Sequence, residues 1–283
     1  MRAVKIVVLM AFLSGCGGGS SSSGNSGEST PLEPAVDPVT EGDWYRPKPL
    51  VTWQWQLQGT VNTGYAVQIY DIDLFDAEVS LIQSIQATGK KVICYFSGGS
   101  YEEWRDDAAD FSPADLGHTL DGWEDEHWLD IRSTNVRDVM EKRLDMAVSK
   151  GCDGVEPDNM DGYINDPGFA FTAADQLAYN RWMANEAHSR ELAIGLKNDL
   201  DQVEELVDYF DFAVNEQCFE YDECDRLQPF IDANKAVLSA EYLDGYVNDA
   251  SRRNQLCTDS VNRQFSTLVL PLDLDDAFRY SCN

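Results

Sequence analysis

Carboxylate, amide, hydroxyl and aromatic side chains stand at the ends of a series of short apolar segments in this chain of 283 residues, and such a set of groups suits a sugar. Cleavage of a glycosidic bond needs two carboxyl groups, one to donate a proton and one to act as nucleophile or base, and it needs no cofactor. Amide and hydroxyl groups would bind the sugar hydroxyls, and aromatic side chains would lie against the sugar rings. The residues that we expect to form this site are Trp53, Gln54, Asp71, Asp73, Tyr95, Asp130, Arg132, Asp158, Asn159, Lys197, Asn198, Glu216, Glu241 and Tyr242.

The elements that must position these residues are strands followed by helices. A helix is expected over about 77–88, and another from Ser133 or Thr134 to Gly151, because apolar residues recur there at helical spacing. Strands that alternate with helices pair in parallel, and about eight such units predict an α/β fold, a (β/α)8 TIM-type barrel in a single catalytic domain. A doubly wound open sheet is the alternative, but the chain has no Gly-x-Gly-x-x-Gly or Walker motif.

Nine segments are strand candidates, one more than the barrel needs. We expect the first to lie outside it, because only residues 59–65 separate that segment from the next, and a crossover helix needs more. The candidates are 52–57, 67–73, 91–96, 128–131, 154–158, 193–197, 212–216, 236–242 and 267–272.

Other chemistries lack their characteristic residues. The segment Asp158-Asn-Met-Asp-Gly162 does not have the spacing of an EF-hand calcium loop. The chain contains no Cys-x-x-Cys, no Gly-x-Ser-x-Gly and no His-Glu-x-x-His, and its three histidines are scattered. We therefore expect neither a metal ion nor a cofactor.

Eight segments, in the same order along the chain, resemble glycoside hydrolase family 114, the endo-α-1,4-polygalactosaminidases. The resemblance implies a (β/α)8 fold and cleavage of α-1,4-linked galactosamine polymers. It also implies that Asp158 and Glu216 are the catalytic pair, with Glu156 as the rival of Asp158 one layer further from the rim. The segments are Trp53-Gln-Trp-Gln-Leu57, Tyr70-Asp-Ile-Asp73, Cys94-Tyr-Phe-Ser97, Trp128-Leu-Asp-Ile131, Gly154-Val-Glu-Pro-Asp-Asn159, Gly195-Leu-Lys-Asn198, Asn215-Glu-Gln-Cys218 and Glu241-Tyr242.

Neighbouring residues suggest the role of each carboxyl group. We expect Lys197 to keep Asp158 ionised as the nucleophile. Phe219 and Tyr221 would form an apolar wall that keeps Glu216 protonated as the general acid.

Galactosamine units carry ammonium groups near neutral pH, so a cationic, galactosamine-rich polysaccharide is the expected partner. The acidic residues that would attract it at the rim are Asp71, Asp73, Asp130, Asp161 and Glu241.

The net charge of the whole chain agrees with this partner. It is −29, and it becomes −31 when a leader with two cations and no anions is removed. Binding of nucleic acid needs clustered Lys and Arg, so we expect no nucleic-acid partner. Solubility is the other explanation of this charge. A monomer is expected. A glycosidase acting on another glycan and a non-catalytic polysaccharide-binding lipoprotein remain alternative functions.

Six cysteines follow Cys16, an even number that suggests disulfides in an exported protein. Cys218 and Cys224 could close a short loop after Glu216, and Cys257 could bond to Cys282. Cys94 lies within an apolar run, where we expect a buried thiol.

The first residues have the layout of a bacterial lipoprotein leader. A short cationic start and the apolar run 6–13 precede Leu13-Ser-Gly-Cys16, which is similar to a lipobox. We expect a signal peptide over 1–15, lipidation of Cys16, a Gly/Ser/Pro-rich tether over 16–43 and the catalytic domain over 44–283. The protein would then be an exported lipoprotein, held at a membrane by its lipid alone and facing the periplasm or the cell exterior.

Overall fold

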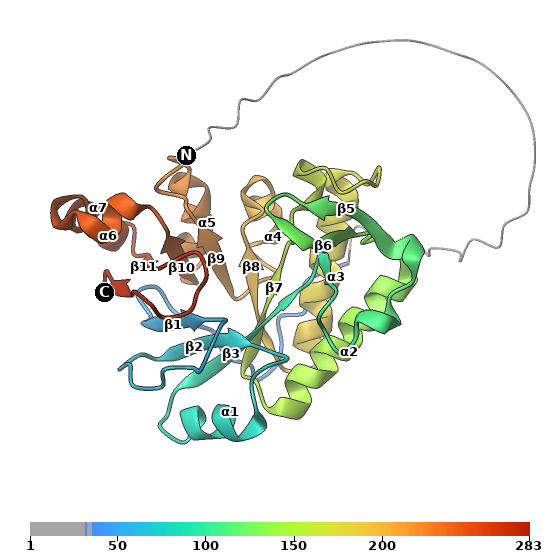
Figure 1. The fold of residues 1–283 in the computed structure, drawn as a ribbon, viewed down its shortest axis with the longest axis horizontal. Coiled ribbons are helices and arrows are strands. Elements are labelled where there is room, and N and C mark those ends of the chain that lie inside the picture. Colours follow the sequence, from blue (N-terminus) through green and yellow to red (C-terminus); the bar gives the residue numbers. More distant parts are fainter. Residues whose placement is uncertain (1–31, 33–35) are drawn as a thin grey trace, which may run out of the picture.

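The structure is a computed structural model that describes residues 32 and 36–283. The expected signal peptide, Cys16 and most of the expected tether lie outside the described residues. Within the described part, every helix is too short or too polar to cross a bilayer. Figure 1 shows an α/β fold in which helices surround a curved sheet.

Eight parallel strands of the described chain form this sheet, and each strand pairs with the next in the order β1, β2, β3, β7, β8, β9, β10 and β11. A ninth strand, β12, pairs antiparallel with β11. The bounds are β1 Trp53–Gln56, β2 Ile69–Asp73, β3 Lys91–Ser97, β7 Gly154–Asp158, β8 Ala193–Lys197, β9 Phe212–Glu216, β10 Ala236–Glu241, β11 Ser266–Val269 and β12 Tyr280–Ser281.

The C-terminal segment closes the space between β11 and β1. The Trp53 indole N–H donates to the carbonyl oxygen of Ser266 at 2.8 Å. The Arg279 guanidinium donates to the carbonyl oxygen of Trp53 at 2.7 Å, and Leu57 N–H donates to that of Leu274 at 3.0 Å. The sheet thus curls into a barrel, and the predicted fold class is confirmed.

The barrel has separate inner and outer hydrophobic cores. Trp53, Trp55, Ile69, Phe212 and Leu238 belong to one buried cluster, which lies inside the barrel. Alternate residues of the same strands belong to a second cluster, which packs against the helices. This is the period-two pattern of strands that are buried on both faces.

The helices lie outside the sheet and agree broadly with the sequence. Helix α2 (Thr134–Lys150) begins after Ser133, whose hydroxyl accepts a hydrogen bond from Val136 N–H. It ends at Gly151, whose φ of 83° is the left-handed conformation that glycine adopts easily. Helix α1 (Val79–Gln86) is shorter than the expected 77–88. The others are α3 Ala173–Ser189, α4 Val203–Leu206, α5 Gln228–Asp232, α6 Asp244–Asn248 and α7 Ala250–Asn262.

The expectation that segment 52–57 lies outside the barrel was wrong. β1 pairs in parallel with β2, with Trp53 opposite Ile69. The connection from β1 to β2 contains no helix, and the Gln56 side chain holds this loop in place. Its amide donates to the carbonyl oxygens of Gln58 and Thr60, and its carbonyl accepts from Asn62 N–H.

The segment outside the barrel is instead 128–131. Its first two residues end β6 (Trp123–Leu129), which pairs antiparallel with β4 (Ser100–Glu102) and β5 (Leu116–Leu120). This small sheet, here called the inserted sheet, is an excursion of the chain between β3 and β7.

Three disulfides are present in the described chain. Cys218–Cys224 and Cys257–Cys282 are the two predicted pairs, and both are confirmed. Cys94 is buried as expected, but it is not a free thiol, because it is bonded to Cys152. The bond joins the outer face of β3 to the turn before β7, two parts that the sequence alone could not bring together.

The residues before β1 pack against the amino end of the barrel. The Trp44 indole N–H donates to Asp211 at 2.9 Å, and Asp211 directly precedes β9. The carbonyl oxygen of Val36 accepts from the Tyr209 hydroxyl, and Val39 N–H donates to Asn185. The packed body therefore begins before residue 44, where the sequence suggested that it starts.

Candidate active site

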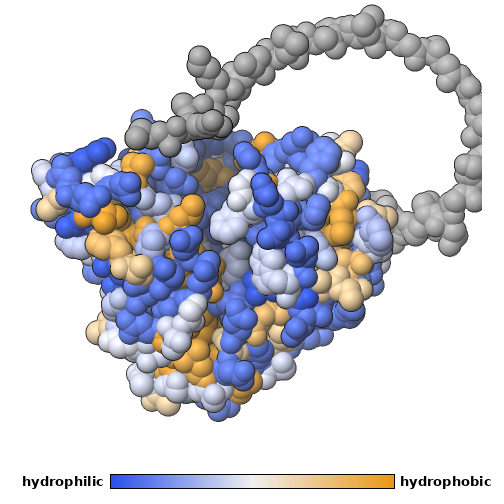
Figure 2. Space-filling model, viewed as in Figure 1, coloured by the Kyte–Doolittle hydropathy of each residue, from blue (hydrophilic) through white to orange (hydrophobic). Residues whose placement is uncertain are grey.

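A cleft of about 480 Å³ lies at the carboxyl end of the barrel strands. Figure 2 shows a recess between the side that carries the inserted sheet and the side formed by β9, β10 and β11. Both proposed catalytic carboxylates line the cleft, as expected for a barrel whose site is built at this end.

Lys197 lies at the centre of the site and joins its carboxylates. Its ammonium nitrogen is 3.0 Å from Asp158 Oδ1, 3.2 Å from Glu216 Oε2 and 3.4 Å from Glu156 Oε1. The three carboxylates come from β7 and β9, the neighbours of β8 on either side. Burial opposes the charge of Lys197, but these carboxylates outweigh it and raise the lysine pKa well above its ordinary value. The site therefore contains a permanent cation.

Asp158 and Glu216 have matching sets of donors. Asp158 Oδ1 accepts from Asn159 N–H at 2.7 Å as well as from Lys197, and its Oδ2 accepts from the Tyr95 hydroxyl at 2.9 Å.

Glu216 Oε2 accepts from the Asn198 amide at 3.3 Å and lies beside Lys197, while its Oε1 accepts from the Tyr242 hydroxyl at 2.5 Å. Burial, followed by the nearby carboxylate, raises the pKa of Tyr242 well above its ordinary value, so its hydroxyl stays protonated. Tyr95 is held protonated in the same way. Each catalytic candidate thus has one oxygen near the lysine and one on a tyrosine.

The backbone after the three site strands turns through a left-handed conformation. Asn159, Asn198 and Gln217 follow β7, β8 and β9, with φ values of 59°, 48° and 64°. Non-glycine residues adopt this conformation at some cost, and such residues concentrate at functional sites. It lets Asn159 N–H reach the side chain of Asp158 and lets Asn198 Oδ1 accept from Glu216 N–H.

Glu156 lies behind Lys197 and does not reach the cleft. Its side chain is fully buried next to that of Asp71, which is buried as well. Burial and the mutual repulsion of the two groups raise the pKa of Glu156 well above its ordinary value, and burial also raises that of Asp71. Burial thus favours the protonated, uncharged form of Glu156. The structure therefore favours Asp158 over its rival Glu156 as the group that meets the substrate.

Other expected site residues also line the cleft. Asp73 does so while it accepts two hydrogen bonds from Arg105, at 3.0 and 2.7 Å. Asp161 lines the cleft too, and burial followed by the charge of Asp158 raises its pKa to about 6.

Several expected residues lie elsewhere. Trp53 is buried inside the barrel, and the Gln54 amide donates to Asp276 behind β1. Asp130 and Arg132 form an ion pair at the start of α2, because segment 128–131 is not a barrel strand. Glu241 faces away from the cleft, where its Oε1 accepts from Phe219 N–H at 2.9 Å.

The expected apolar wall beside Glu216 is absent from its described surroundings. Phe219 packs against Phe265 with ring centres 6.3 Å apart, and Tyr221 is 61% exposed. The neighbours of Glu216 are instead the polar groups of Lys197 and Tyr242.

The sequence did not predict that the inserted sheet supplies part of the wall of the cleft. Trp104, Trp123, Glu102 and Glu126 line the cleft, although they belong to no barrel strand. Two tryptophans within a strongly charged stretch were the available signal in the sequence. In residues 32 and 36–283, no group of three or more histidine, cysteine or acidic side chains is arranged to hold a metal ion.

Comparison with known proteins identifies the family of this chain. The model of glycoside-hydrolase family GH114 matches residues 34–283. The crystal structure of Aspergillus fumigatus Ega3 in complex with galactosamine is 42% identical, with a TM-score of 0.80, over 85% of this chain and 100% of that one. The glycoside hydrolase domain of PelA from Pseudomonas aeruginosa is 11% identical, with a TM-score of 0.64, over 80% of this chain and 96% of that one. It shows that the fold is shared. A search of curated proteins found no match. The chain is therefore a glycoside hydrolase that belongs to family GH114.

Proposed function

We propose that this enzyme cleaves α-1,4-linked galactosamine polymers within the chain, with Asp158 as nucleophile and Glu216 as general acid. The observation that carries the proposal is the pair of carboxylates joined by Lys197 at the floor of an acidic cleft. A cationic sugar polymer is complementary to this charge. The Ega3 structure, which contains galactosamine, supports the choice of sugar.

The shared lysine suits a reaction in which negative charge passes from one carboxylate to the other. In the first step Glu216 protonates the departing glycosidic oxygen while Asp158 attacks the anomeric carbon. Asp158 then becomes an uncharged ester and Glu216 becomes an anion. Glu216 next removes a proton from water, which attacks the anomeric carbon and releases Asp158. At each stage one of the two carboxylates is charged, and Lys197 contacts both.

The spacing of the pair favours retention of configuration. Asp158 Oδ1 and Glu216 Oε2 lie 3.0 and 3.2 Å from one nitrogen atom, so they are at most about 6.2 Å apart. Retaining enzymes have carboxyl groups about 5–5.5 Å apart, whereas inverting enzymes need about 6.5–9.5 Å to admit a water molecule. A covalent intermediate is therefore part of the proposal.

Cleavage within the polymer is supported by a second hollow beside the first. It shares Asp161, Asn198, Glu216 and Gln217 with the cleft and continues past them to Tyr221 and Arg226. A polymer could thus extend to both sides of the carboxylate pair.

The test is incubation of the purified protein with α-1,4-galactosamine oligomers, followed by mass spectrometry of the products. Asp158→Asn and Glu216→Gln should each lower turnover by about 10²–10⁴-fold with folding intact, because each keeps the shape but loses the reactive group. A substrate with a good leaving group should rescue only the Glu216→Gln variant. Near-normal turnover in both variants would refute the assignment, and cleavage of another glycan alone would refute the substrate.

The lipid anchor at Cys16 and the exported, membrane-held location remain proposals from the sequence.

A further inference from the structure

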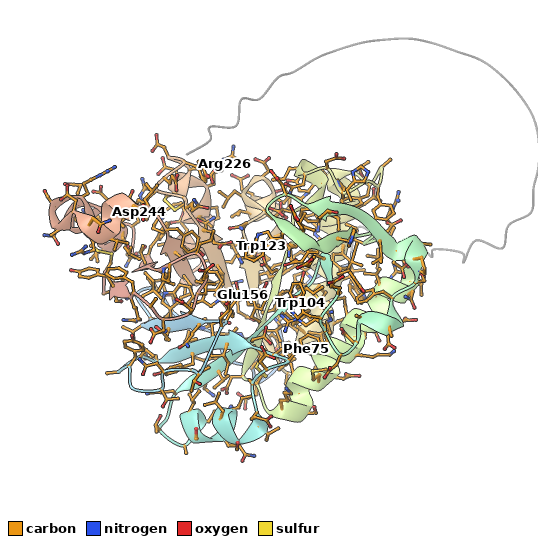
Figure 3. The ribbon with its side chains drawn as sticks, in the orientation of Figure 1. Phe75, Trp104, Trp123, Glu156, Arg226 and Asp244 are labelled. Atoms are coloured by element: carbon orange, nitrogen blue, oxygen red, sulfur yellow. A yellow bond between two sulfur atoms is a disulfide. The ribbon has the colours of Figure 1, made fainter. Side chains whose placement is uncertain are left out.

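The inserted sheet supplies one wall of the cleft, and this wall contains two exposed aromatic rings. Trp104 follows β4 and Trp123 begins β6, and they are 53% and 48% exposed although both line the cleft. Figure 3 labels both tryptophans in the middle of the molecule, together with Glu156 of the barrel. Large aromatic side chains held in solvent at the edge of a polar cleft are suited to contact the apolar face of a sugar ring.

The same wall holds a carboxylate that lacks a cation. Glu126 lines the cleft but is only 9% exposed, and its Oε2 accepts from the Ser100 hydroxyl at 2.7 Å. Within the described chain Glu126 forms no ion pair. Burial, followed by the charges of Glu102 and Asp158, raises its pKa to about 7. Such a group would be stabilised as an anion by a cation that enters the cleft.

The cations nearest to this wall are already engaged. Arg105 donates to both Asp73 and Glu102. Lys197 contacts the carboxylates at the floor of the cleft. The second oxygen of Glu102, Oε2, is buried and lies 4.0 Å from Arg143 Nη1. The wall therefore offers the carboxylate of Glu126 to a ligand, and it has no free cation of its own among the described residues.

We infer that the inserted sheet forms a binding subsite for a protonated amino sugar, in which Glu126 accepts a hydrogen bond from the ammonium group and Trp104 and Trp123 contact the ring. The inference rests on the proposed function and names the residue that distinguishes an amino sugar from its acetylated form. An acetyl group removes the charge that Glu126 would pair with.

Binding and cleavage are measured separately so that the two proposals can fail separately. Binding is followed by tryptophan fluorescence in a Glu216→Gln background, with α-1,4-galactosamine oligomers and the same oligomers after full N-acetylation. Glu126→Gln is the test variant, because Gln keeps the shape and can still accept from Ser100. Glu124→Gln is the matched control, since Glu124 is an exposed carboxylate of the same strand. Cleavage is measured with the unmodified active site.

Glu126→Gln should weaken binding of the free-amine oligomer by about tenfold or more, because a hydrogen bond between charged groups is lost. It should change binding of the acetylated oligomer less than twofold, and Glu124→Gln should change neither. Trp123→Ala should weaken both oligomers alike, because ring contact does not sense the charge.

Equal weakening of both oligomers by Glu126→Gln would overturn the inference and leave Glu126 a structural residue that positions Ser100. Unchanged binding of both would overturn it as well. If galactosamine oligomers bind in a Glu126-dependent way but the active enzyme does not cleave them, the subsite is supported and the proposed function fails. If the enzyme cleaves them with no dependence on Glu126, only the subsite fails.

Discussion

Lys197 and the carboxylates around it illustrate how closely buried charges must be matched. Three carboxylates lie within 3.4 Å of one ammonium group, and Asp71 lies behind them. A buried carboxylate without a compensating cation is costly, so the group furthest from solvent is the one that keeps its proton. Of the three carboxylates beside Lys197, that group is Glu156, which is fully buried. We therefore expect Glu156 to position Lys197 and Asp158 to be the reactive group.

This division of roles predicts that Glu156→Gln is tolerated far better than Asp158→Asn. A protonated Glu and a Gln have similar shape, and both offer a carbonyl oxygen to Lys197. We expect turnover of Glu156→Gln within about tenfold of the unmodified enzyme, against a loss of about 10²-fold or more for Asp158→Asn. Steady-state kinetics on galactosamine oligomers, with circular dichroism as a folding control, make the comparison. An equally severe loss in both variants would mean that Glu156 takes part in the chemistry.

At the scale of elements, the two buried disulfides Cys218–Cys224 and Cys94–Cys152 have different structural roles. The first closes a loop with a sequence separation of 6 directly after Glu216, and the second joins residues 58 positions apart. Glu241 holds the same short loop by accepting from Phe219 N–H. Restriction of the unfolded chain grows with loop length and contributes about 2 kcal/mol for the short loop and about 4 kcal/mol for the long one.

Removal of the long-range bond should therefore cost more stability, and removal of the short-range bond should cost more activity. Cys94→Ser with Cys152→Ser should lower the melting temperature more than Cys218→Ser with Cys224→Ser does. The second pair should lower kcat/KM more at a temperature where both variants are folded, because its loop begins two residues after Glu216, the proposed general acid. Differential scanning calorimetry and initial rates give the two rankings. The reverse order in either measurement would contradict this view.

The barrel strands were predictable because each is an apolar run that ends in polar residues. The inserted sheet was not, because β4 is three residues long and β6 begins with four charged or exposed residues, Trp123 to Glu126. Its placement also depends on a close approach: a Cβ atom at Gly99 would lie 1.8 Å from the carbonyl oxygen of Asn159. Contacts between distant segments of this kind leave no periodic signal in the sequence.

The side on which a residue at a strand end lies follows the in-and-out alternation of that strand. Asp158, Lys197 and Glu216 follow the inner alternation of their strands and meet in the cleft. Glu241 directly follows Ala240, which belongs to the inner cluster, so its side chain faces outward. One residue further on, Tyr242 returns to the inside and reaches Glu216. A polar residue at a strand end is thus weak evidence without its register.

At the scale of the whole molecule, many carboxyl groups are buried in a chain whose net charge is −29. Burial is the main cause of their raised pKa values: it raises the pKa of Glu241 to about 7 and that of Asp199 to about 8. In the unfolded chain these groups would lose their protons near pH 4. Between these values these groups hold more protons in the folded protein than in the unfolded one, so their contribution to stability falls as the pH rises.

Asp199→Asn tests this dependence. Asn suits the left-handed φ of 46° at this position, and its carbonyl can still accept from the Asn180 amide. Between about pH 4 and pH 8 the free energy of unfolding should decline less steeply in the variant, by up to about 1.4 kcal/mol per pH unit for one proton. Urea unfolding across this range gives the slope. Asp208→Asn, at an exposed position, is the control, and identical slopes in all three proteins would contradict the assignment.

The packing of residues 36–47 against the amino end of the barrel determines which way an attached enzyme would face. The chain enters the folded body beside Asp211 and Ala236, where β9 and β10 begin, and the carboxylate pair lies where the strands end. The point where the described chain enters the folded body and the carboxylate pair thus lie at opposite ends of the barrel. If the N-terminus is fixed to a membrane, the mouth of the barrel points away from the lipid. Long polymers arriving from outside could then enter without colliding with the surface, whereas glycans lying flat on that same surface would be shielded by the body of the enzyme.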